Sequence, residues 1–91
     1  MRIGKAVNEN TIPVYPIRTV SRLTGVGEGA LRAWEVKYGV IYPARTKGGH
    51  RLYSESDVVR VREIKRLLHE DGLSMDGVIS VLSGRRGAGN G

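Results

Sequence analysis

The segment Ala44–Ser54, with the sequence ARTKGGHRLYS, concentrates side chains that bind anions. Three cations, a histidine and a tyrosine surround the pair Gly48-Gly49. A turn that only connects two strands needs the glycines, because both can adopt a positive φ, but it does not need the cations. Arginine and lysine donate charge-assisted hydrogen bonds to phosphate and carboxylate oxygens. The composition of this segment therefore predicts an anionic partner opposite it.

The chain as a whole is basic, and its charge is concentrated in one part. Among 91 residues, 15 are lysine or arginine and nine are acidic, which gives a net charge of +6. Within residues 18–51 the only acids are Glu28 and Glu35. The sequence therefore predicts one electropositive end of the domain, which suits nucleic acid, a membrane surface or an acidic protein as partner.

The same composition argues against several classes of protein. The chain has no cysteine and only two histidines, His50 and His69, so neither a disulfide framework nor a thiolate zinc site is expected. No nucleophile accompanies the carboxylates, and we expect no enzymatic activity, no metal and no cofactor. No apolar run reaches the roughly 20 residues that span a bilayer, and residues 1–13 lack the apolar core of a signal peptide. We therefore expect a cytoplasmic protein without a membrane partner.

Two short helices with a glycine turn between them precede the basic segment. A brief extended stretch is expected before Pro16, which disfavours helix in the residue it follows. The apolar residues at helical spacing in the first helix are Ile17, Val20 and Leu23. Those of the second helix are Leu31, Trp34 and Tyr38. Gly25 and Gly39 are predicted to end the two helices.

The basic segment is predicted to form a hairpin, with arms Ala44–Lys47 and His50–Tyr53. Ser54 is expected to cap a long helix together with Asp57. The apolar stripe of this helix is predicted as Val58, Val61, Ile64 and Leu68, with Gly72 after its end. Its cations, which we expect to be solvated, are Arg60, Arg62, Lys65 and Arg66. Ser74 should cap a last helix.

This order of elements predicts a mainly α fold with a small β-hairpin, a winged helix-turn-helix of about four helices. Residues 1–13 and the glycine-rich residues 83–91 cannot bury enough surface to offset the entropy lost on ordering. We expect both ends to be flexible and the folded domain to span residues 14–82. In such a fold the second helix fits the major groove of DNA while the hairpin, or wing, reaches phosphates. A wing whose charges are merely solvated is the alternative.

Four motifs make a family resemblance specific: LTGV at 23–26, ALRAWE at 30–35, YG…PxRTxGGHRxY at 38–53 and SxxDV at 54–58. With them, residues 15–82 resemble the DNA-binding domain of MerR-family transcription regulators. The sequences of these motifs are most similar to those in the branch of CarA/CarH-type repressors and MlrA-like regulators. The resemblance implies sequence-specific binding of double-stranded DNA as part of a bacterial transcription regulator associated with the nucleoid.

The resemblance also implies which residues meet DNA. Arg32 matches the family's recognition-helix arginine in the major groove, and the methyl group of Ala33 could touch a thymine methyl. Arg45 and Arg51 stand on opposite arms of the wing, where they are expected to grip neighbouring phosphates. For Tyr53, phosphate contact and packing both stay open. The full predicted set is Arg18, Arg22, Arg32, Ala33, Lys37, Arg45, Thr46, Lys47, His50, Arg51 and Tyr53.

The chain departs from the family pattern where the second helix begins. Gly27, Glu28 and Ala30 stand where members usually carry a Ser or Thr cap, a proline and a threonine, so the base preference should differ. Glu28 either repels phosphates or accepts from a cytosine amine. Two other functions stay open: an excisionase-like or architectural DNA-binding factor, and a module bound by an acidic protein that imitates DNA. Because family members dimerise through a later helix, we expect a monomer here and a dimer if a longer native protein supplies that region.

Overall fold

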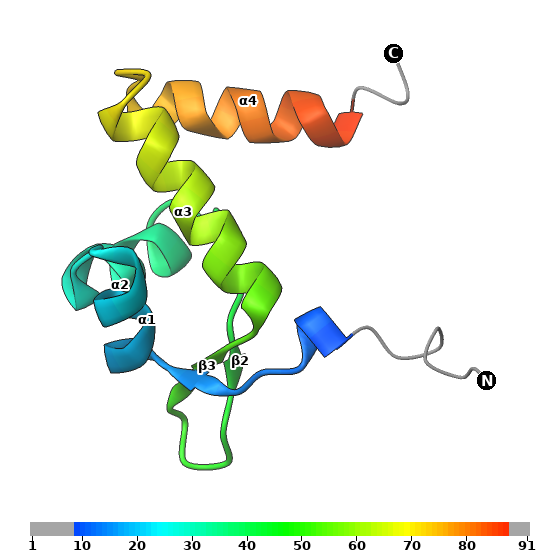
Figure 1. Ribbon diagram of the computed structural model, residues 1–91. Coiled ribbons are helices and arrows are strands. Elements are labelled where there is room, and N and C mark those ends of the chain that lie inside the picture. The colour runs from blue at the N-terminus through cyan, green and yellow to red at the C-terminus, as the bar shows by residue number, and fades with distance from the viewer. Residues whose placement is uncertain (1–8, 88–91) are drawn as a thin grey trace.

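The predicted order of elements is confirmed by the computed structural model, which describes residues 9–87 (Figure 1). Four α-helices and a three-stranded sheet make up this part of the chain. In chain order the elements are η2 (Glu9–Thr11), β1 (Tyr15–Pro16), α1 (Ile17–Thr24), α2 (Glu28–Val36), β2 (Ala44–Arg45), β3 (Arg51–Tyr53), α3 (Glu55–His69) and α4 (Met75–Gly87).

The sheet fixes the wing to the start of the helix-turn-helix. Strand β3 is central and pairs antiparallel with both neighbours, with Tyr53 opposite Tyr15 and Arg51 opposite Arg45. The extended stretch predicted before α1 is therefore the third strand of the sheet. Since Pro16 of β1 directly precedes Ile17 of α1, the sheet also holds the first turn of α1.

The wing turn differs from the prediction in two respects. The strands are shorter than the predicted arms, because residues 46–50 form the turn. Of the two glycines only Gly49 has a positive φ, 88°. The Gly49 N–H donates to the Thr46 carbonyl at 2.9 Å, and the His50 N–H donates to Thr46 Oγ1 at 3.1 Å. This arrangement, a turn followed by one left-handed residue, leaves Gly48 with an ordinary φ.

Helix α3 is the centre of the core. Helices α1 and α2 lie on one side of it, the wing lies beyond its first turn, and α4 crosses its C-terminal end (Figure 1). The buried apolar residues of the helices are Val20, Leu31, Trp34, Val58, Val61, Ile64, Leu67, Val78 and Leu82. Leu67, rather than the predicted Leu68, completes the α3 stripe, because the buried positions recur every three residues up to that point. Leu68 is half-buried at the edge of the core.

Two of the residues that stand at helical spacing in the sequence lie differently in the fold. Leu23 is exposed (47%), and Thr24 is buried instead, its hydroxyl donating to the Val20 carbonyl at 2.7 Å. Helix α2 ends at Val36, so Tyr38 lies outside it as a half-buried residue of the following loop. The chain leaves α2 through hydrogen bonds to its last carbonyls and through Gly39, whose φ is 61°.

Regular secondary structure extends beyond the predicted domain bounds at both ends of the described part. Helix α4 continues to Gly87, five residues beyond the predicted limit at Leu82, and η2 packs against α3. The Gly77 N–H donates to Ser74 Oγ at 3.1 Å, so the predicted cap of α4 is present. Residues 1–8 and 88–91 of the predicted tails lie outside the described residues.

The predicted capping box at the start of α3 is confirmed. Ser54 Oγ accepts from the Asp57 N–H at 3.1 Å, and Asp57 Oδ2 accepts from the Ser54 N–H at 2.8 Å. Both residues follow β3 directly, so the box fixes the direction in which α3 leaves the sheet. The wing and the central helix are therefore joined without a flexible linker.

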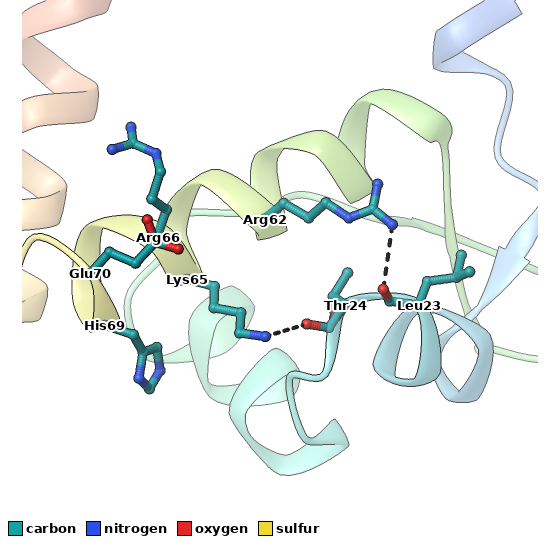
Figure 2. Close-up of a pocket in the computed structure, with 7 residues that line it drawn as sticks. All are labelled: Leu23, Thr24, Arg62, Lys65, Arg66, His69 and Glu70. Carbon is teal, nitrogen blue, oxygen red and sulfur yellow. Dashed lines mark hydrogen bonds between the residues drawn. The ribbon is translucent and has the colours of Figure 1, made fainter.

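Three of the four α3 cations contact the helix-turn-helix or the loop after it, contrary to the solvated face that the sequence predicted, whereas Arg66 is exposed and pairs with Glu63 and Asp71. Lys65 Nζ donates to the Thr24 carbonyl at 2.8 Å and Arg62 to the Leu23 carbonyl at 3.4 Å (Figure 2). Arg60 donates to the Val40 carbonyl at 2.8 Å. The Leu23 and Thr24 carbonyls lie at the end of α1, where carbonyls lack intrahelical partners, and α3 supplies their donors; the Val40 carbonyl lies in the loop after α2. These three cations therefore brace α3 against the helix-turn-helix.

Candidate nucleic-acid interface

A groove runs between the start of α1, the exposed side of α2 and the wing. Its lining residues are Pro16, Ile17, Arg18, Arg32, Gly49, His50 and Arg51. Arg18 comes from the first turn of α1, Arg32 from the middle of α2 and Arg51 from β3. The fold thus brings three arginines that are distant in sequence to one side of the molecule.

Arg32 is the exposed cation of α2 in this groove. Its guanidinium lies 3.1 Å from Glu28 Oε1, one turn earlier on the same helix, and both side chains are well exposed. An exposed pair of this spacing contributes only about 0.3–0.5 kcal/mol, so it does not withhold Arg32 from a partner. Gly27 provides no side-chain cap, and Glu28 in the first turn interacts favourably with the positive end of the helix dipole.

The two wing arginines converge on one carboxylate of α2. Arg51 Nε donates to Glu35 Oε1 at 2.6 Å, and Arg45 Nη2 lies 3.2 Å from Glu35 Oε2. The Arg51 side chain is 15% exposed and that of Arg45 is 43% exposed. Arg45 also donates to the Gly49 carbonyl at 3.1 Å, across the wing turn. In the free protein both arginines contact Glu35. Their expected contacts with phosphates stay a prediction.

Other predicted cations are exposed and unengaged. Lys47 stands at the wing tip, and Arg18 and Arg22 lie on α1. Across residues 9–87 none of these three side chains makes a hydrogen bond or an ion pair. Such side chains can reorient towards phosphates without first breaking an interaction. Of these three, only Arg18 lines the groove itself.

Three further residues of the predicted DNA-binding set, Ala33, Lys37 and Thr46, lie outside the groove. Thr46 uses its hydroxyl to close the wing turn, and Ala33 is half-buried beside Arg32. Lys37 follows α2 and places its ammonium 5.3 Å from the centroid of the Tyr38 ring, a cation–π contact. None of these residues lines the groove.

Tyr53 packs in the core and does not reach the groove. Its side chain is fully buried, and its hydroxyl has no hydrogen-bond partner among residues 9–87. Burial raises the pKa of this phenol to about 12, with Glu35 and Asp57 adding to the shift and Arg51 and Arg32 opposing it. Of the two roles that the sequence left open, the geometry supports packing.

Glu35 is the residue of this site that the sequence reasoning missed. From the sequence alone it is one of only two acids among the cations of residues 18–51. A signal was present, because Glu35 follows Arg32 by three residues and so lies on the same side of α2 one turn later. Its two partners, however, are 10 and 16 residues away in the sequence.

The described residues offer neither a metal site nor a membrane-spanning helix. Residues 9–87 contain no group of three or more His, Cys, Asp or Glu side chains placed to hold a metal ion. None of the helices in that range has the length and apolar character needed to cross a membrane.

A helix-turn-helix whose second helix and β-wing line one basic groove defines a winged helix-turn-helix protein of the DNA-binding class. Residues 15–85 match the family model described as "MerR HTH family regulatory protein". This chain belongs to the MerR family, as its sequence motifs predicted.

The relatives of this chain are bacterial transcription regulators. It is 46% identical over 65 residues to the HTH-type transcriptional repressor CarA of Myxococcus xanthus, covering 70% of this chain and 23% of CarA. It is 41% identical over 70 residues to the HTH-type transcriptional regulator MlrA of Escherichia coli, covering 77% and 28%. The regulator GlnR of Bacillus anthracis is 39% identical over 75 residues, covering 82% and 57%. The chain therefore spans between about a quarter and just over half of these relatives.

Proposed function

We propose that this chain is the sequence-specific, double-stranded-DNA-binding part of a bacterial MerR-type transcription regulator. MerR-family regulators bind double-stranded DNA. The observation that supports the proposal most directly is the groove in which Arg18, Arg32 and the wing residue His50 come together. A duplex laid across this groove meets α2 and the wing at the same time.

The proposed division of labour follows from exposure and chemistry. Helix α2 enters the major groove, where the guanidinium of Arg32 can donate two hydrogen bonds to a guanine edge and Ala33 can contact a thymine methyl. Arg18 and Lys47 neutralise phosphates on either side, because they are exposed and unengaged within residues 9–87. These phosphate contacts set the register, and α2 reads the bases.

The proposal also covers the cellular location, the oligomeric state and a competing partner of the chain. Such a regulator acts in the cytoplasm, at the nucleoid, and needs no catalytic activity of its own. One domain offers a single half-site, so we propose that this chain binds DNA as a monomer and that a longer native protein would dimerise. An acidic protein that imitates DNA would occupy the same groove, and it would compete with a duplex for Arg32 and the wing.

A salt series tests the proposal. The affinity for a short duplex of mixed sequence is measured at several salt concentrations for the wild type and for Arg18→Gln and Lys47→Gln. Each phosphate contact that is lost should make the negative slope of log K against log[salt] shallower by about 0.9 and weaken binding to all sequences. Arg66→Gln is the control, because Arg66 is similarly exposed but lies on α3 beside Asp71, away from the groove. Unchanged affinities and slopes for both Arg18→Gln and Lys47→Gln would refute the proposal.

A further inference from the structure

Glu35 joins the recognition helix to both strands of the wing. Its carboxylate lies on the last turn of α2 and is 20% exposed. One oxygen accepts from Arg51 at 2.6 Å, and the other lies 3.2 Å from Arg45. In residues 9–87, these are the only ion pairs that connect α2 with the wing.

The two arginines that hold Glu35 are also cross-strand neighbours. Arg45 and Arg51 face each other in the β2–β3 ladder, at the base of the wing turn. Their guanidinium groups therefore leave the hairpin at one level and meet on one carboxylate. Arg45 makes a further hydrogen bond to the Gly49 carbonyl, which ties the turn to the same cluster. The base of the wing is thus held to α2, and the tip with Lys47 extends beyond it.

The charge of this cluster leaves the wing attractive to DNA. Two guanidinium groups and one carboxylate sum to one positive charge. Arg51, the less exposed of the two, makes the shorter contact, as expected for the partner that carries more of the fixation. Arg45 is more exposed and can face a phosphate while Arg51 keeps the contact with Glu35.

We propose that Glu35 is a positioning residue: it sets the angle and distance between the wing and the recognition helix, so that both meet one duplex. This inference rests on the proposed function, in which α2 and the wing bind the same DNA. A wing that is already placed does not lose its freedom on binding, and ordering of rotamer-rich side chains and loops is a large part of what association costs.

The direction in which duplex affinity changes when the Glu35 carboxylate is removed distinguishes a positioning role from charge repulsion alone. A carboxylate near DNA repels phosphates, so its removal by itself raises affinity for a duplex. A carboxylate that holds the wing in place has the opposite effect, because its removal frees the wing. Glu28 offers a matched control, since it is on the same helix and also pairs with an arginine, at 3.1 Å, but does not contact the wing.

The experiment compares Glu35→Gln with Glu28→Gln in two measurements. The affinity for a short duplex of mixed sequence should fall by about tenfold in Glu35→Gln, the cost of ordering one or two side chains anew, and should rise in Glu28→Gln. In the free protein, amide ¹⁵N relaxation should show lower order for residues 46–50 in Glu35→Gln only. Unfolding in urea confirms that each variant is folded under the conditions used.

A second variant keeps the inference falsifiable if Glu35→Gln does not fold. Arg51→Lys keeps the positive charge but loses the Nε donor that binds Glu35 Oε1 at 2.6 Å. A pure phosphate contact predicts little change, whereas positioning predicts the same loosened wing and the same loss of affinity. The inference is overturned if either variant binds DNA as tightly as the wild type or keeps wild-type order in residues 46–50.

The two readouts separate this inference from the proposed function. If the wild type does not bind DNA, the proposed function fails, and the relaxation data on the free protein still decide whether Glu35 holds the wing. If the wild type binds and Glu35→Gln binds equally well, the positioning role fails while the proposed function stands.

Discussion

Removal of the buried hydroxyl group of Tyr53 is expected to stabilise the folded protein. The side chain is fully buried, and within the described residues its hydroxyl has no hydrogen-bond partner. Burying an unpaired hydroxyl costs about 1–3 kcal/mol, and Tyr53→Phe removes that cost while keeping the ring in place. We therefore expect the variant to be more stable than the wild type by about that amount.

Urea and thermal unfolding at neutral pH measure this effect. For a domain of this size, each kcal/mol corresponds to a rise in Tm of roughly 4–8 °C. Tyr15→Phe is the matched control, because the Tyr15 hydroxyl donates to Glu55 at 2.8 Å and its loss removes a made hydrogen bond. That variant should be equal to or less stable than the wild type. A Tyr53→Phe variant that is less stable than the wild type would refute the reasoning.

The pH dependence supplies an independent check on the same residue. The pKa of Tyr53 is raised to about 12 in the folded protein, from the ordinary value of 10.0. The folded state therefore keeps the phenol neutral where the unfolded chain ionises. This contribution to stability is complete below pH 10 and is lost as the pH rises to 12. Relative to the wild type, Tyr53→Phe should lose less stability across that interval, and its affinity for DNA at neutral pH should not change.

Three further variants test how the interface is held in place. Ser54→Ala removes the capping box with Asp57 and should cost about 1 kcal/mol in urea unfolding; no loss would mean that the box is dispensable. Gly49→Ala places a side chain at a φ of 88° and should cost about 1–2 kcal/mol, with resonance shifts confined mainly to the wing; an unperturbed wing spectrum would contradict the turn geometry. Lys65→Met leaves the Thr24 carbonyl without its donor and should cost about 1 kcal/mol, whereas DNA affinity should be unchanged because this contact lies at the end of α1 away from the groove; weaker DNA binding by the folded variant would count against that separation.

The sequence predicted the elements better than the faces that they bury. Hydrophobic period, glycines and the Ser54 cap sufficed for the helices and the hairpin. Leu23 is apolar but exposed, because the geometry of α1 places Thr24 on the buried face. At 3.6 residues per turn, position 24 lies only about 20° from Ile17 around α1, whereas position 23 lies about 120° away. Thr24 can occupy the buried face because its hydroxyl finds an acceptor within the same helix, at Val20.

The candidate site was predicted in its composition but not in its internal contacts. The excess of cations and the family motifs were sufficient to select the residues of α1, α2 and the wing. The pairing of Glu35 with Arg45 and Arg51 depends on how the hairpin folds back against α2, which no local pattern contains. The same holds for Tyr53, since its burial is decided by the packing of β3 beneath α3.

The central claim is that α2 and the wing bind one duplex together, and amide resonances of the labelled protein test it most directly. During titration with a short duplex of mixed sequence in low salt, the resonances of Arg18, Arg32 and residues 46–51 should shift together with one apparent affinity. Those of α4 residues 75–82, at the far end of α3, should stay in place. Shifts in α4 alone, or in Arg32 without the wing, would contradict the account.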